Sequence, residues 1–277
     1  MSKVITSDDF SGNYIHFGVR ENAMAAISNG LVLSGFEVMC GTFLVFSDYM
    51  RPSIRLSAIM NLNTRYIMTH DSIGVGEDGA THQPIEHLSS LRAIPGINLY
   101  RPASGLETIA AIRDLLDSNG QSIIALTRQK IDRLDSNTTT LQSGAYVISY
   151  EEEKRELDFT VFASGSEVNI ALKLKRLLKT HNFNIRVISV VCFDKLALSD
   201  HKTIKFFCND ASHLIAIEAG IDMGWHKIIG KYGNFYGLSA FGTSGKGTDL
   251  YEYYSLTADK IAKQILIDLN SNLISNV

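Results

Sequence analysis

Short β-rich apolar runs alternate with amphipathic segments along almost the whole chain, and this alternation constrains the fold more than any other feature. Such a pattern is typical of parallel sheets covered by helices. We expect strands over residues 36–43, 65–69, 97–100, 122–127, 158–163, 184–191 and 213–217. We expect helices over residues 21–33, 46–60, 167–180 and 257–269, with a further helix capped by Ser104 and Glu107 in a capping box. The prediction is an α/β protein with two α/β domains and largely parallel sheets.

The chain has 277 residues, which is long for one average domain and suits two. A polar segment without periodicity, residues 130–143, separates the two α/β patterns and is the predicted linker. We therefore place the first domain at residues 1–135 and the second at residues 145–277.

Charge and composition exclude several classes of partner. The formal net charge of −3 gives no electrostatic reason to expect nucleic acid. No apolar stretch is long enough to span a bilayer, and the first residues lack the apolar core of a signal peptide, so we expect no membrane partner and a cytoplasmic location. Cys40, Cys192 and Cys208 lie far apart with no C-x-x-C pair, so we expect reduced, mostly buried thiols.

Two segments of the first half contain residues with ordinary structural explanations. Glu21 ends the string YIHFGVRE (residues 14–21), and a glutamate at a helix start is favoured by the helix dipole. Phe43, Phe46 and Tyr49 recur every three residues within GTFLVFSDYMR (residues 41–51), so they share one helical face. In isolation this spacing indicates an aromatic stripe packed in the core.

The loop THDSIGVGEDGATHQP (residues 69–84) is the most specific stretch. Its G-x-G-x-x-G is followed by Pro84 and not by an apolar helix, which excludes a dinucleotide site. A metal site would have to use ligands whose spacing matches no metal motif; the residues concerned are His70, Asp71, Asp78, His82 and His87. The remaining interpretation is polar substrate recognition, because the loop follows a strand at the end where α/β ligand sites form.

Arg128 and the turn at residues 164–166 can each be explained by a purely structural role. Arg128 follows a predicted strand in LTRQK (residues 126–130), where an arginine is often only a solvated cap. The turn at residues 164–166 lies between a strand and a helix, so its amides could bind an anion, although a tight turn is the simpler interpretation.

Taken together and in this order, the strings resemble those of transketolases, and the resemblance covers nearly the whole chain. The second half adds TVFASGSEV, AIEAGI and SAFGTSG, which resemble the transketolase C-terminal domain. The resemblance implies a pyrimidine-binding domain followed by that C-terminal domain. It also implies thiamine diphosphate as cofactor and transfer of a two-carbon ketol unit between sugar phosphates.

The resemblance assigns cofactor roles to four residues. Glu21 matches the glutamate that activates the cofactor. A carboxyl group hydrogen-bonded to the pyrimidine nitrogen favours the reactive tautomer of the cofactor. Phe43, Phe46 and Tyr49 match the aromatic pocket that grips the pyrimidine, with Phe46 as the stacking residue. Pro52 departs from the family pattern and should kink its helix or mark the first turn.

The resemblance also assigns substrate roles. His70 and His82 would bind the ketose oxygens or relay protons to them, and Asp78 would bind the C2 hydroxyl of the acceptor aldose. Arg128 would clamp the sugar phosphate, with Arg92 as a weaker second candidate. Lys130 stands where the family has asparagine. No catalytic residue is assigned to the second half.

The transketolase half that binds diphosphate through a metal ion has no counterpart here, since its Gly-Asp-Gly signature is absent. An early strand of the pyrimidine domain also has no match. Either a separate partner chain supplies that half or this chain is a fragment, and the missing strand favours a fragment, because a parallel sheet that lacks a strand exposes an unpaired edge. We therefore expect Mg²⁺ or Ca²⁺ to be bound by a separate diphosphate-binding domain or subunit, the assembly to be a homodimer or heteromer, and this chain alone to be inactive.

Two other functions remain open at this point. One is a different thiamine enzyme, such as a deoxyxylulose-phosphate synthase or a 2-oxoacid dehydrogenase β-subunit, but these lack the combination of GVREN, GEDGATHQP and TRQ. The other is a non-catalytic dimerisation or regulatory module that kept the fold.

Overall fold

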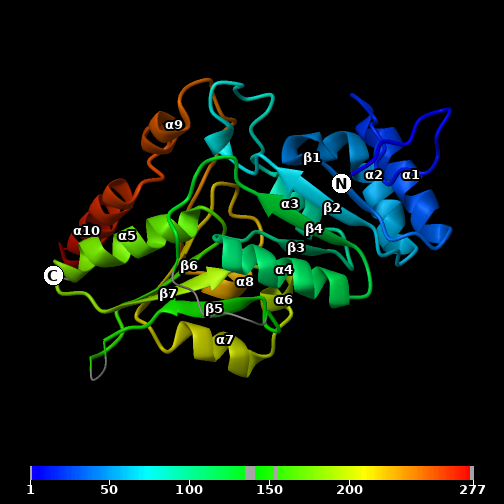
Figure 1. Ribbon diagram of the computed structural model, residues 1–277. Helices are drawn as coiled ribbons and strands as arrows, with labels where there is room; N and C mark the ends of the chain where they lie inside the picture. Colours follow the sequence, from blue (N-terminus) through cyan, green and yellow to red (C-terminus); the bar gives the residue numbers. More distant parts are fainter. Residues whose placement is uncertain (1, 135–140, 153–154, 275–277) are drawn as a thin grey trace.

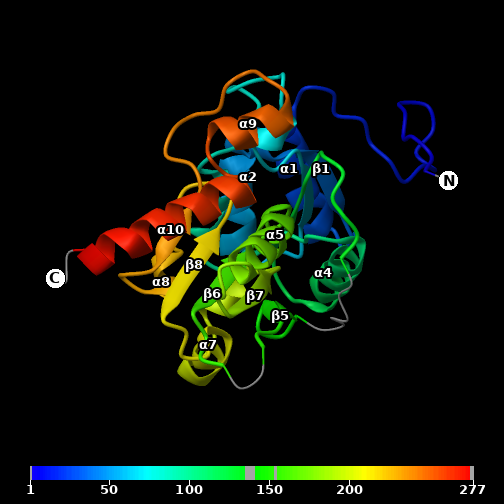
Figure 2. The same ribbon diagram turned by 90° about the vertical axis from the view of Figure 1, so that its left-hand side faces the viewer.

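Two α/β halves lie side by side in the computed structural model, which describes residues 2–134, 141–152 and 155–274. Figure 1 shows the first half around strands β1 to β4 and the second around β5 to β7. The N-terminal segment extends away from the body of the first half (Figure 2). The predicted α/β class with two α/β domains and largely parallel sheets is confirmed.

The first sheet is entirely parallel and has the strand order β1-β2-β4-β3. Its strands are β1 (Met39–Phe43), β2 (Arg65–Thr69), β3 (Asn98–Tyr100) and β4 (Ser122–Leu126). Its helices are α1 (Glu21–Leu33), α2 (Ser47–Ile59), α3 (His87–Arg92) and α4 (Gly105–Asp117), with short 3₁₀ turns η1 (Leu44–Phe46) and η2 (Ile73–Val75). Fully buried Leu44, Met50 and Tyr66 belong to the core beneath α1 and α2.

The predicted strand over residues 36–43 begins three residues late, at Met39. Helix α1 is followed by Gly35 with φ of +87°, as expected for a left-handed cap, and the Phe36 N–H donates to the carbonyl of Leu31 at 3.1 Å. Because this capping bond holds Phe36 against the helix, the strand cannot begin there. Pro52 lies inside α2 and not in its first turn.

Helix α4 starts as predicted at Ser104, whose Oγ accepts the N–H of Glu107 at 3.2 Å. The reciprocal half of the capping box differs, because the Glu107 carboxylate accepts from the N–H of Ala103 at 2.5 Å. The same carboxylate accepts from the Tyr146 hydroxyl at 2.7 Å, so the cap joins the two halves. Burial raises the pKa of Glu107.

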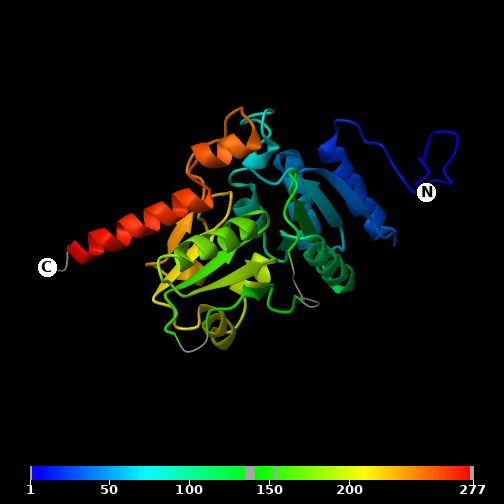
Figure 3. The same cartoon turned by 60° about the vertical axis from the view of Figure 1, so that its left-hand side comes forward.

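The second sheet has the order β5-β7-β6-β8-β9 and is parallel except for its edge strand β5. Its strands are β5 (Ala145–Ser149), β6 (Phe159–Ala163), β7 (Ile185–Val190), β8 (His213–Ile217) and β9 (Asn234–Tyr236). Its helices are α5 (Glu167–Lys179), α6 (Phe193–Ala197), α7 (His201–Cys208), α8 (His226–Ile229), α9 (Gly247–Tyr253) and α10 (Ala258–Ile274). Figure 3 shows α5 and α10 running along one side of this sheet.

Several elements of the second half were not predicted. The antiparallel strand β5, the short strand β9 and the helices α6 to α9 are absent from the sequence-based expectation. Helix α10 continues to residue 274, beyond the predicted end at residue 269. The middle of the predicted linker, residues 135–140, lies outside the described residues.

The halves meet where the first sheet ends. The Arg101 N–H donates to the carbonyl of Val191 at 2.7 Å, and Tyr100 forms an isolated antiparallel bridge with Cys192. All three cysteines are free, with Cys40 and Cys192 buried, as expected. None of the helices in the described ranges is long and apolar enough to cross a membrane.

Candidate functional site

Several of the predicted site residues follow the carboxyl ends of adjacent strands. In the β1–β2 register Phe43 lies opposite Thr69, and in the β2–β4 register Thr69 lies opposite Leu126. His70 therefore leaves β2 between the ends of β1 and β4, and Arg128 follows two residues after β4. In open α/β sheets this edge is where ligands bind.

An aromatic cluster joins the predicted pocket wall to both loop histidines. The Phe43 ring stacks on His70 with centroids 3.5 Å apart and on Phe46 at 5.7 Å. The Phe46 ring also meets His82 edge-on at 5.5 Å and Tyr49 at 6.2 Å. Tyr49 is 62 % exposed and the two phenylalanines are half-buried, so the stripe is not a packed core stripe.

Electrostatics links His70 to two other predicted residues. Burial and the positive charge of Arg128 lower the pKa of His70, against smaller opposing effects of Asp78 and Asp71. His70 is therefore a neutral imidazole near pH 7, with one nitrogen that donates and one that accepts. Its backbone has φ of +60°, which is uncommon for a residue with a side chain.

Glu21 is the first residue of α1 and is half-buried. The next residue, Asn22, donates from Nδ2 to the carbonyl of Tyr49 at 3.2 Å, which fixes the start of α1 against α2. The carboxyl group of Glu21 and the partly exposed rings of Phe43, Phe46 and Tyr49 are groups that suit a flat heterocycle with a ring nitrogen. The residues present thus fit the pyrimidine end of thiamine diphosphate.

Two of the five potential metal ligands of the loop region contact residues outside the loop. Asp71 is 1 % exposed and is held by Arg101 Nε at 2.8 Å. His87 instead lies with Asp48 and Glu86, whose donor atoms fall within 4.8 Å of one another. The rejection of a metal site built from the five residues stays a prediction.

The prediction that Arg92 is a second candidate for binding the sugar phosphate is wrong. Its side chain is 5 % exposed and donates two hydrogen bonds to the fully buried carboxylate of Glu218, at 2.7 and 2.8 Å. A guanidinium committed in this way cannot receive a phosphate from solvent. The turn at residues 164–166 is a tight turn, because the next three amides, those of Glu167, Val168 and Asn169, donate to its carbonyls.

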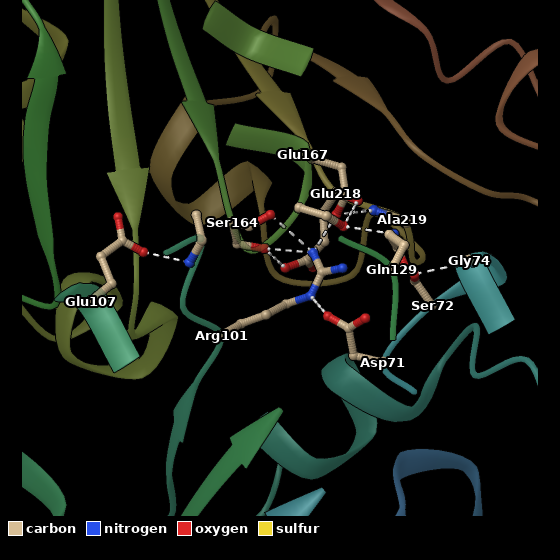
Figure 4. A network of polar contacts seen from close by, with 12 residues as sticks. Asp71, Ser72, Gly74, Arg101, Glu107, Gln129, Ser164, Glu167, Glu218 and Ala219 are labelled. Carbon is tan, nitrogen blue, oxygen red and sulfur yellow. Dashed lines mark hydrogen bonds and ion pairs between the residues drawn. The ribbon is translucent and has the colours of Figure 1, made fainter. Parts of the chain in front are cut away.

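A buried charge network beneath the loop was missed by sequence reasoning. Arg101 is fully buried and contacts Asp71, Glu167 and Ser164, as Figure 4 shows. Glu218 lies in the same network, accepting from the Ser164 hydroxyl at 2.5 Å. The network joins the loop after β2 to the second half, and no local motif in the sequence marks it.

Comparison with known proteins agrees with this architecture. The family model "Transketolase, pyrimidine binding domain" matches residues 2–133, and "Transketolase-like TK C-terminal domain" matches residues 144–257. Curated transketolases of Sinorhizobium medicae and Bacillus subtilis are 42 % and 39 % identical over 95 % and 96 % of the chain. The chain covers 38 % and 41 % of those two relatives, so it spans about two fifths of their length.

Solved structures show the same relationship. The transketolase of Campylobacter jejuni superposes with a TM-score of 0.87 at 37 % identity, covering 93 % of this chain and 40 % of that one. A "Split gene transketolase, inactive beta4 tetramer" superposes at 0.77 with 21 % identity, covering 92 % of this chain and 83 % of that one, which shows a shared fold. The chain belongs to the transketolase family and consists of its pyrimidine-binding and C-terminal regions.

Proposed function

We propose that this chain supplies the pyrimidine half of a thiamine diphosphate site and the sugar-phosphate funnel of a transketolase, with domains at residues 1–135 and 145–277. The enzyme would transfer a two-carbon ketol unit from a ketose phosphate to an aldose phosphate. The observation that carries the proposal is the aromatic cluster, which places both loop histidines against the rings predicted to hold the cofactor.

Four residues would hold the cofactor. Phe46 would stack on the pyrimidine, with Phe43 and Tyr49 as the wall, since their rings are partly exposed and mutually in contact. Glu21 would hydrogen-bond the pyrimidine nitrogen from the start of α1. Thiamine diphosphate, when bound, supplies the carbanion chemistry of ketol transfer.

Four residues would hold the substrate beside it. His70, neutral at pH 7, can accept or donate a proton at a sugar oxygen, and His82 lies against the same ring cluster. Asp78 would accept a hydrogen bond from the acceptor's C2 hydroxyl. Exposed Arg128 would bind the phosphate, because a guanidinium offers two parallel donors to its oxygens.

The diphosphate and its Mg²⁺ or Ca²⁺ would be bound by a partner domain or subunit, since the chain spans only about two fifths of its relatives. The chain would then act in a homodimer or heteromer and be inactive alone. The split-gene transketolase supports this arrangement, because that protein comes from a divided gene and its β tetramer is described as inactive. The cytoplasmic location stays a prediction.

Calorimetric titration with thiamine diphosphate and magnesium tests the proposal. We expect no measurable heat of binding to the chain alone, and binding when the diphosphate-binding region of a transketolase is added. In that mixture Phe46→Ala should weaken binding about tenfold, because stacking contributes about 0.5–1.5 kcal/mol beyond the buried area. Tight binding to the chain alone, or no effect of Phe46→Ala in the mixture, would contradict the proposed half-site.

A further inference from the structure

The loop that contains His70 and His82 packs against residues 238–247 from the other half of the chain, which form a second loop and the first residue of α9. The contact is made by glycines. A Cβ on Gly79 would lie 2.5 Å from Ser244 Oγ, and a Cβ on Gly247 would lie 3.2 Å from the carbonyl oxygen of Gly74. The missing side chains let the two backbones approach closely.

Gln83, the residue after His82, fastens this contact. Its side chain is 2 % exposed, and Nε2 donates to the carbonyl of Gly76 at 2.8 Å and to that of Thr243 at 2.9 Å. One amide group thus ties the loop to itself and to the second half. A Cβ on Gly242 would fall 1.6 Å from Gln83 Oε1, so the opposing loop has room for this amide only because residue 242 is glycine.

Tyr251 of helix α9 makes a second link. Its hydroxyl donates to the buried Glu167 carboxylate at 2.8 Å and lies 3.3 Å from the hydroxyl of Ser72. Ser72 in turn accepts the N–H of Gly74 at 3.2 Å (Figure 4). Glu167 also pairs with Arg101, which holds Asp71, the residue next to His70.

We propose that the second half of the chain positions the two loop histidines, with Gln83 and Tyr251 as positioning residues. Through these contacts the loop keeps His70 stacked on Phe43 and His82 against Phe46. The C-terminal region then has a role at the site beyond packing. The bearing of this arrangement on sugar recognition rests on the proposed function, but the positioning itself is a property of this chain.

Two substitutions on opposite sides of the contact test the proposal. Gln83→Met keeps the length of the side chain and removes its hydrogen-bond donor. Gly242→Ala displaces the Gln83 amide through a substitution that lies outside the histidine loop. Gly30→Ala is the matched control, because a Cβ there meets nothing within 4 Å. The first readout is amide hydrogen exchange at Gly79 and His82, whose N–H groups donate within the loop.

Both test variants should exchange these loop amides about tenfold faster than the control, since each loses one or two hydrogen bonds that hold the loop. Exchange in strands β2 and β4 should not change. Exchange at the control rate in both variants would overturn the proposal. If Gln83→Met does not fold, Tyr251→Phe gives the same test from the other link.

The second readout is the NMR chemical shift of the ring protons of each histidine. A variant that only lowered the free energy of unfolding, with the folded loop unchanged, would not alter these shifts. Stacking on Phe43 at 3.5 Å should displace the His70 ring protons upfield. In both variants these signals should move toward the values of an exposed histidine. Signals that stay in place would overturn the proposal. Neither readout uses cofactor or turnover, so a negative result here leaves the proposed function standing, and the calorimetric titration tests that function separately.

Discussion

Replacing Arg101 by methionine should cost the chain much of its folding free energy. The guanidinium is fully buried and lies between the carboxylates of Asp71 and Glu167, which are 1 % and 0 % exposed. Methionine fills a similar volume but leaves two buried carboxylates without a positive charge. Removing one partner of a buried ion pair costs about 3–5 kcal/mol, which is a large share of the roughly 5–15 kcal/mol that stabilises a native domain.

The assay is urea unfolding followed by the fluorescence of Trp225, the only tryptophan of the chain. With a urea slope of about 2 kcal/mol/M, the midpoint should fall by roughly 2 M. Arg113→Met on α4 is the control, because this arginine is exposed and should change stability by less than about 0.5 kcal/mol.

A double-mutant cycle separates charge from packing. Glu167→Gln removes one of the two carboxylates, so it should cost clearly less in the Arg101→Met background than in the native chain, with a coupling above about 1 kcal/mol. Additive costs, or an Arg101→Met midpoint within about 0.5 M of the Arg113→Met control, would refute the reasoning that this network holds the two halves together.

Two predictions concern pH. Arg128→Gln should raise the pKa of His70, because burial and the Arg128 charge together lower it; a histidine NMR titration in which that pKa stays the same or falls would count against the assignment. Burial alone would raise the pKa of Glu218, but the pairing with Arg92, together with Arg101 and the Ser164 hydrogen bond, outweighs burial and lowers that pKa to about 2. This pairing stabilises the chain above the ordinary pKa of 4.5, and the stabilisation is lost as pH falls toward 2. The loss of unfolding free energy caused by Arg92→Leu, measured by Trp225 fluorescence in urea, should therefore shrink over that pH range. A loss that does not change with pH would show that the ion pair is not its source.

The fold and the proximity of several candidate site residues were largely predictable because both follow from local patterns. Alternating apolar runs place the strands, and strand ends in a parallel sheet share one edge, which brings His70 and Arg128 together. The rings of Phe43, Phe46 and Tyr49 do contact one another in sequence, but the predicted single helical face is wrong, because Phe43 ends strand β1, Phe46 ends the 3₁₀ turn η1 and only Tyr49 lies in α2. The roles of these residues in binding remain predictions.

What the sequence concealed depends on partners far along the chain. Arg92 is a second, weaker phosphate candidate in the sequence because nothing near it shows that Glu218, 126 residues later, lies against its guanidinium. Arg101 was overlooked for the same reason. Strand β5 was missed because it follows directly on the polar linker and is defined by its antiparallel pairing with β7, a contact that local periodicity does not contain.

The central claim is that this chain is the pyrimidine half of a transketolase site, and ketol transfer in a reconstituted mixture tests it most directly. The chain is combined with the separately prepared diphosphate-binding region of a transketolase, thiamine diphosphate and magnesium, and transfer from a ketose phosphate to an aldose phosphate is measured. We predict turnover only in the mixture, abolished by Glu21→Ala and retained by Glu156→Ala at an exposed position of the second half. Turnover by the chain alone, or turnover in the mixture that survives Glu21→Ala, would contradict the account.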